Sequence, residues 1–215
     1  MRADIRGAGS AKRVHKIRPA TVTELGTIVE KMPERYQAMI LLASWCALRF
    51  GELTELGRKD LVLGEHEGVV HVERAVVRVE DGFQVTTPKT DAGIRDVAIP
   101  PHLVPIIKTH LDEFVSDEPG ALLFPAVHGG HLAPATLYRQ FYKARSEANR
   151  PDLRWHDLRH SGAVLAAATG ATLAELIARL GHSTPTAAMR YQHAAQGRDK
   201  QIAALLSKIA ENGGS

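Results

Sequence analysis

Apolar residues recur at helical spacing in the first quarter of the chain. The segment 21–24 (TVTE) has the pattern of a capping box and predicts a helix that ends near Met32. Pro33 suits the first position of a second helix. The apolar run of residues 39–48 predicts that this second helix is buried in the core, and a short helical segment is expected at 51–56.

The period then changes from helix-like to strand-like. Residues 69–79 are rich in valine, Asp81-Gly82 is a hairpin signal, and 83–87 would be the returning strand. Residues 94–99 alternate as a third strand, with Lys89 in the turn that precedes it. The pattern therefore predicts a small three-stranded antiparallel sheet.

The helical pattern returns after Pro100. A second capping box at 172–175 opens a helix that Gly181 closes, and Ser183 or Thr184 can cap the next one. The other helices are expected at 101–115, 134–149, 156–168 and 198–210. We expect an α+β fold that is mainly α-helical, with the small antiparallel sheet in its middle.

Composition places the chain among ordinary globular proteins. It has 215 residues, of which 44% are hydrophobic and 24% are charged. The one cysteine, Cys46, lies in an apolar run and is expected to be a buried structural thiol. No stretch approaches the roughly 18 apolar residues of a membrane span, and the N-terminus lacks the apolar core of a signal peptide. We therefore expect a cytoplasmic protein with no membrane partner.

Charge permits nucleic-acid binding without proving it. The net charge is +3, and residues 1–20 hold six lysines and arginines against one acid. This basic leader or linker either lies along a DNA backbone or is a solvated tail.

Other chemistries lack their motifs. There is no glycine-rich phosphate loop with its lysine, no CxxC pair and no HExxH. His156 and His160 have half of a zinc-binding spacing, but no third ligand is placed by the sequence. We expect neither a metal nor another cofactor.

Two arginines occupy positions where a charged side chain is expected to have a specific partner. Arg49 directly follows the most apolar segment, so it either forms an ion pair with Glu52 or Glu55 or is held rigidly in a site. His156 and Arg159 share a helix face, where an imidazole and a planar guanidinium can bind an anion together. Each feature alone is more typical of a solvated or ion-paired side chain.

Four segments taken together carry more weight. In order along the chain they are ALRFGEL, TTPKTDAGIRDVAIP, WHDLRHSGAVLAAATG and LGHSTPTAAMRYQHA. Their order and spacing over about 21–195 resemble the catalytic domain of the tyrosine recombinase, or phage integrase, family. The resemblance implies the catalytic residues Arg49, Lys89, His156, Arg159, His182 and Tyr191. Glu52 and His160 would support them.

The resemblance also implies a function. The expected enzyme is a site-specific recombinase that cleaves and rejoins double-stranded DNA through a covalent 3′-phosphotyrosyl intermediate, without ATP. It would act as a homotetramer on DNA, with accessory DNA-bending proteins as further partners. A type IB topoisomerase-like strand transferase, or a DNA-binding module with little catalysis of its own, are the alternatives.

Domain boundaries follow from the same comparison. Residues 1–20 would be the leader, 21–196 the catalytic domain, and 197–215 a C-terminal helix and tail that relatives often lend to a neighbouring protomer. Relatives usually carry an N-terminal DNA-binding domain, for which about twenty residues are too few, so this chain is either part of a longer protein or a minimal one. It departs from the family at Ala187 and Ala188, where threonines are common.

Overall fold

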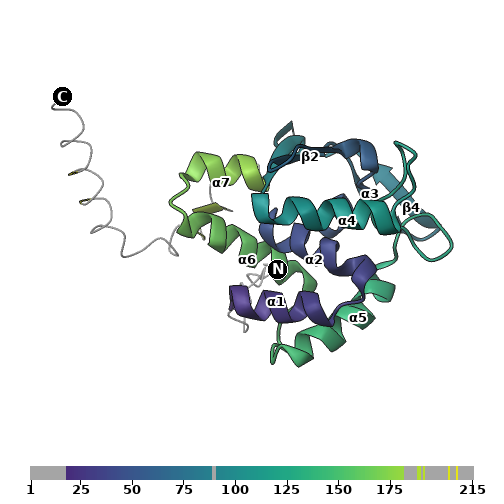
Figure 1. Ribbon diagram of the computed structural model, residues 1–215, viewed down its shortest axis with the longest axis horizontal. Coiled ribbons are helices and arrows are strands. Elements are labelled where there is room, and N and C mark those ends of the chain that lie inside the picture. Colours follow the sequence, from purple (N-terminus) through teal and green to yellow (C-terminus); the bar gives the residue numbers. More distant parts are fainter. Residues whose placement is uncertain are drawn as a thin grey trace, which may run out of the picture.

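The computed structural model describes residues 18–88 and 91–181, together with Ala188, Met189, Tyr191, Ala203 and Ser207. Its α-helices are α1 (Val22–Lys31), α2 (Glu34–Trp45), α3 (Phe50–Glu55), α4 (Val104–Phe114), α5 (Pro134–Glu147), α6 (Trp155–Ala168) and α7 (Leu173–Leu180). Figure 1 shows the strands along the upper edge of the molecule, with α2, α1 and α5 below them. The expected α+β fold, mainly helical with a small antiparallel sheet, is confirmed.

Local sequence signals explain several helix ends. Thr21 and Glu24 form the capping box of α1, and Thr172 and Glu175 form that of α7, as predicted. Gly181 ends α7 in the left-handed conformation, with φ of 59°. Pro33 is the N-cap of α2 and stands one position before the helix, not at its first position.

The strands that form the sheet are not the ones expected from the sequence. The three-stranded antiparallel sheet has the order β1 (Leu61–Leu63), β2 (Gly68–Val72), β5 (Arg95–Ile99). A separate hairpin pairs β3 (Ala75–Val79) with β4 (Gly82–Thr86), so the single strand predicted at 69–79 is two strands. Glu73 and Arg74 interrupt it.

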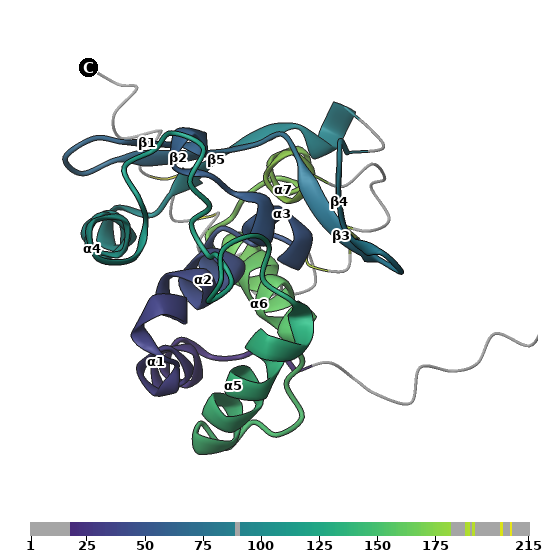
Figure 2. The same ribbon diagram turned by 90° about the vertical axis from the view of Figure 1, so that its right-hand side faces the viewer.

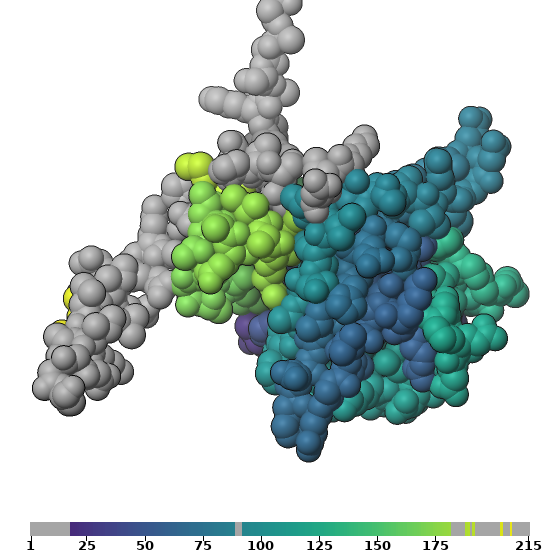
Figure 3. Space-filling view, turned by 90° about the horizontal axis from the view of Figure 1, so that it is seen from above, coloured from purple at the N-terminus to yellow at the C-terminus, as the bar shows by residue number. Residues whose placement is uncertain are grey.

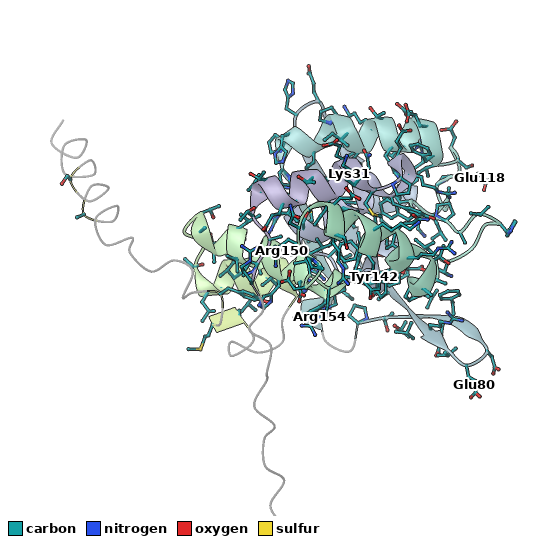
Figure 4. All side chains as sticks on the ribbon, turned by 90° about the horizontal axis from the view of Figure 1, so that it is seen from below. Lys31, Glu80, Glu118, Tyr142, Arg150 and Arg154 are labelled. Carbon is teal, nitrogen blue, oxygen red and sulfur yellow. The ribbon has the colours of Figure 1, made fainter. Side chains whose placement is uncertain are left out.

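Arg74 accounts for this interruption. Its guanidinium donates to both carboxylate oxygens of Asp60, at 2.9 and 2.8 Å, and to Glu55 at 3.2 Å. These bonds turn the chain toward α3 and away from the line of β2. The hairpin that follows stands out from the body of the molecule, with Glu80 at its tip (Figure 4).

The helices α2 and α6 cross at the centre of the domain. A Cβ atom on Gly162 of α6 would lie 1.8 Å from the carbonyl oxygen of Ser44 on α2, so only glycine permits this approach. Figure 2 shows α1 and α5 at one end of the molecule and the strands with α7 at the other. The crossing therefore sets the distance between the C-terminal end of α2 and the first turns of α6.

The buried interior is formed by apolar side chains of both ends. Cys46 is fully buried, and burial raises the pKa of its thiol to about 12, so the predicted structural thiol is confirmed. Among the described residues, no helix is both long enough and apolar enough to cross a bilayer.

Candidate active site

Arg159 lies inside the domain on the second turn of α6, with 4% of its surface exposed. Its guanidinium donates to the carbonyl oxygens of Ala47 and Leu180. Ala47 has a φ of 53°, in the left-handed region, where the chain turns out of α2. A charge buried this deeply needs acceptors, and the bonds described for it all go to carbonyl groups.

Arg49 approaches the same region from the N-cap position of α3. Its Nη1 donates to Oε1 of Glu52 at 2.7 Å, and its backbone N–H donates to Oε2 of Glu52 at 2.7 Å. Its Nη2 donates to the carbonyl of Gly181 at 2.9 Å. Of the two predicted acidic partners, Glu52 is the one that pairs with Arg49, and 40% of the Arg49 side chain stays exposed.

Sequence reasoning missed a third arginine, Arg95, at the start of β5. It donates through Nη1 and Nη2 to the two carboxylate oxygens of Glu52, both at 3.0 Å, and through Nε to the carbonyl of Arg179 at 3.0 Å. Its side chain is 5% exposed. A charge at the first residue of a mostly apolar strand was the available signal, but nothing local showed which partner it meets.

The three arginines cap one helix end. Arg95, Arg159 and Arg49 donate in turn to the carbonyls of three consecutive residues at the C-terminus of α7, namely Arg179, Leu180 and Gly181. The last carbonyls of a helix have no partner within it and carry partial negative charge. The end of α7 therefore holds three guanidiniums side by side, and Figure 3 shows α7 beside the strands on this face.

The charge in this corner is only partly balanced. Burial alone would raise the pKa of Glu52, but hydrogen bonds and charge from Arg95, and then Arg49, lower that pKa to about 2. Burial lowers the pKa of Arg159 to about 9, and the charge of Arg49 acts in the same direction. One carboxylate thus faces three guanidiniums, which leaves a net positive charge able to attract an anion.

Tyr191 contacts α6 at His160, the residue directly after Arg159. Its hydroxyl lies 2.9 Å from Nδ1 of His160, and the two rings meet edge to face with centroids 4.8 Å apart. Tyr191 is 4% exposed. The sequence placed His160 only as a supporting residue, whereas in the structure it contacts the tyrosine directly.

His156 lies one turn earlier on α6 and is largely exposed. Partial desolvation of its ring lowers its pKa, and the charge of Arg159 lowers it further. The imidazole is therefore held toward its neutral form beside the arginines. Within the described residues, no group of three or more histidine, cysteine or acidic side chains could hold a metal ion.

Two predicted site residues, Lys89 and His182, lie outside the described residues. The same holds for the expected cap at Ser183 or Thr184, and for the expected helix at 198–210 apart from Ala203 and Ser207.

Ala188 shows how the tyrosine segment packs. It is fully buried in a second apolar cluster with Tyr191 and with residues of α6 and α7, whose members include Ala163 and Leu180. The alanine that departs from the family pattern is therefore used for close packing, and it helps to hold Tyr191 against α6.

The sequence pattern that describes the phage integrase family matches residues 15–198 of the chain. The chain belongs to the phage integrase family. A Mycobacterium tuberculosis protein named as the integrase of prophage phiRv2 is 66% identical over 210 residues, which cover 97% of this chain and 56% of that protein. The integrase of Mycobacterium phage D29 is 39% identical over 192 residues, covering 88% of this chain and 51% of that protein.

This family member therefore spans about half the length of the curated integrases it matches. Among solved structures, the Tn1549 transposon integrase in complex with circular intermediate DNA superposes with a TM-score of 0.72 at 18% identity, covering 92% of this chain and 68% of that one. The XerA recombinase superposes with a TM-score of 0.67 at 19% identity, covering 97% and 69%. The chain thus has the fold of a tyrosine recombinase catalytic domain.

Proposed function

We propose that the chain is the catalytic domain of a site-specific DNA recombinase of the integrase type. The observation that carries this proposal is the pair Arg49 and Arg159, which share the end of α7 and retain uncompensated positive charge. The tyrosine that would attack DNA, Tyr191, contacts the helix that carries Arg159. Arginines, histidines and a tyrosine in one place suit metal-free phosphoryl transfer.

The arginines would bind the phosphate that is cut. Negative charge builds up on the non-bridging oxygens of a phosphodiester under attack, and preorganised donors stabilise it without reorganisation. Each guanidinium is planar and offers paired donors to phosphate oxygens. The exposed part of Arg49 would contact the phosphate first, and the more deeply buried Arg159 would contribute positive charge from inside the domain.

Tyr191 would be the nucleophile. A phenol has an unperturbed pKa of about 10 and attacks poorly unless a base takes its proton or positive charge favours the phenolate. His160 is placed to accept that proton at Nδ1. Attack would join the tyrosyl oxygen to the phosphorus, which stays on the 3′ oxygen of one nucleotide, and would break the bond from phosphorus to the 5′ oxygen of the next.

The remaining roles rest on the sequence pattern. Lys89 would protonate the leaving 5′ oxygen, and His156 and His182 would donate hydrogen bonds to the phosphate or move protons. Reversal of the same steps would rejoin the strands, because the phosphotyrosyl bond conserves the energy of the phosphodiester. No step requires ATP or a metal ion.

Recombination is favoured over the two alternatives by the relatives. Their names are integrase and tyrosine recombinase, and a type IB topoisomerase is not among them. A DNA-binding module without catalysis would not need Tyr191 in contact with His160. The topoisomerase alternative predicts relaxation of supercoiled DNA by one protein at one site, which a recombinase assay with two sites separates from strand exchange.

The wider assembly is also a proposal. Double-stranded DNA would be bound in the cytoplasm by a homotetramer, with accessory DNA-bending proteins as further partners. Residues 1–20 would lie along the DNA backbone, 21–196 would form the catalytic domain, and 197–215 would be exchanged with a neighbouring protomer and couple its active site to the next.

The direct test is formation of a covalent protein–DNA adduct. The protein is incubated with a pool of nicked duplexes whose sequence around the nick is randomised, and adducts are separated on a denaturing gel. Wild type and Tyr142→Phe, which alters an exposed tyrosine on α5, should both form adduct, and Tyr191→Phe should form none while still binding DNA. Undiminished adduct from Tyr191→Phe would refute the assignment.

A further inference from the structure

Arg95 joins β5 to both α3 and α7 beside the active-site arginines. It lies at the first position of β5. Its two Nη atoms donate to Glu52 on α3, and its Nε atom donates to a carbonyl at the end of α7. Its Nη1 also donates to the carbonyl of Gly93 at 3.1 Å. The guanidinium therefore joins three separate segments in one plane.

Glu52 transmits this connection to Arg49. Each of its carboxylate oxygens accepts one bond from Arg95 and one from Arg49, the latter from the side chain at Oε1 and from the backbone at Oε2. The carboxylate is 4% exposed, so water cannot readily replace either partner. A change in the position of Arg95 must therefore move the carboxylate that orients Arg49.

Arg95 also holds the C-terminal end of α7 in place. Arg95 binds the carbonyl directly before the one that accepts from Arg159, and two before the one that accepts from Arg49. Gly181 leaves the necessary room, because a Cβ atom there would lie 2.9 Å from Nη1 of Arg95 and 2.9 Å from the carbonyl oxygen of Ala92. Arg95 thus sets how closely α7 approaches α3.

We propose that Arg95 is a positioning residue for strand cleavage, which fixes the spacing between Arg49 and Arg159 through Glu52 and the end of α7. This inference rests on the proposed function. Arg95 does not contact the phosphate itself, because its side chain is buried and its three nitrogens are already bonded. Lysine cannot replace it, since one ammonium group cannot bind a carboxylate in a planar fork and a carbonyl at its side together.

The variants are Arg95→Lys and Arg95→Gln, with Arg74→Gln as the matched control. Arg74 is also ion-paired to α3, through Glu55, but it binds Asp60 and neither α7 nor Glu52 among its described partners. Adduct formation is timed at saturating DNA on the nicked pool, and DNA affinity is measured separately. Both Arg95 variants should slow adduct formation by about tenfold or more, because small misplacements of reacting groups are costly, with affinity changed by less than about threefold.

Two further readouts separate positioning from loss of structure. A methylphosphonate in place of the phosphate that is cut removes one charged oxygen, so the reaction depends less on the two guanidiniums and the deficit of Arg95→Gln should shrink to about threefold or less. In a Glu52→Gln background, Arg95→Gln should cost less than about a further twofold, because both changes break the same link. Arg74→Gln should stay within about twofold of wild type throughout.

A third readout does not depend on activity. The Nη groups of Arg49 should give separate ¹⁵N NMR signals in the wild type, where its guanidinium is held, and averaged signals in Arg95→Lys, with assignment by Arg49→Lys. Absence of any Tyr191 adduct in the wild type would defeat the proposed function and leave this NMR test of Arg95 standing. Wild-type cleavage by Arg95→Lys, an equal deficit on both substrates, or unchanged Arg49 signals would each overturn the positioning role.

Discussion

Arg150 and Arg159 are both deeply buried, and their surroundings are opposite. Arg150, labelled in Figure 4, is 1% exposed and donates to the carboxylates of Asp152 and Glu24 and to the carbonyls of Arg18 and Pro19. Hydrogen bonds that Arg150 donates to Asp152 and then to Glu24 outweigh burial and raise its pKa. Arg159 binds carbonyls, and burial lowers its pKa to about 9.

The difference separates a structural charge from one that awaits a partner. Arg150 is neutralised by its own domain and fastens the segment before α1 to the connection between α5 and α6. The described hydrogen bonds of Arg159 all go to carbonyl groups, and Arg49 repels it, so an anion that binds there stabilises the site strongly. A buried arginine without a carboxylate partner is therefore a stronger sign of an anion site than burial or charge alone.

The largest effect should come from Arg159→Lys. An ammonium cannot donate to two diverging carbonyls and a phosphate together, so adduct formation should fall by about a hundredfold or more. Arg150→Lys is the matched control and should leave cleavage near wild type wherever the protein is folded. Similar cleavage by wild type and Arg159→Lys would remove the basis of the comparison.

Arg150→Met should mainly affect folding. Removing the cation leaves Glu24 and Asp152, which are both partly exposed, without their shared partner, and losing hydrogen bonds between charged groups costs up to about 3 kcal/mol. Urea unfolding should show this loss, while the folded fraction keeps its rate of adduct formation. A loss below about 1 kcal/mol would show that Arg150 is not the clamp described here.

Glu52→Gln should change how the free energy of unfolding depends on pH in the acid range. The folded pKa of Glu52 is about 2, against about 4.3 unfolded, so this carboxylate stabilises the fold above the unfolded value and loses that effect as the pH falls toward 2. The difference corresponds to about 3 kcal/mol. The variant should be less stable than wild type at pH 6, and the gap should close between about pH 4.5 and pH 2.

Inorganic phosphate should give the smallest effect. At about ten times its dissociation constant, an anion that binds only the folded state adds about 1 kcal/mol of stability. Thermal unfolding should shift upward with phosphate in wild type and less in Arg159→Lys, with sodium chloride at equal ionic strength as the control. Equal shifts in both proteins would show that phosphate binds elsewhere.

The sequence predicted most of what is encoded locally. Capping boxes at Thr21 and Thr172, and glycine after α7, act over three or four residues, so these helix ends could be found without a structure. The pairing of Arg49 with Glu52 also lies within one turn of helix. Local spacing and turn chemistry were sufficient in each case.

What depends on distant contacts was not predicted. Strand β1 has three residues and pairs only because β2 lies beside it, and the break between β2 and β3 follows from the bonds of Arg74 to Asp60 and Glu55. In the sequence Arg95 looks like an ordinary strand residue, because the carbonyl that accepts its hydrogen bond lies 84 residues later, at the end of α7. The contact of His160 with Tyr191 spans 31 residues and is likewise invisible to spacing along one helix.

Locating the covalent bond between protein and DNA tests the role of Tyr191 most directly. Adduct from the nicked pool is digested with nuclease and protease, and the peptide that retains a nucleotide is sequenced by mass spectrometry. We expect the nucleotide on Tyr191, joined through a 3′ phosphate, with the yield reduced by about a hundredfold or more in Arg159→Lys. A nucleotide on any other residue, or an equal yield from Arg159→Lys, would contradict the account.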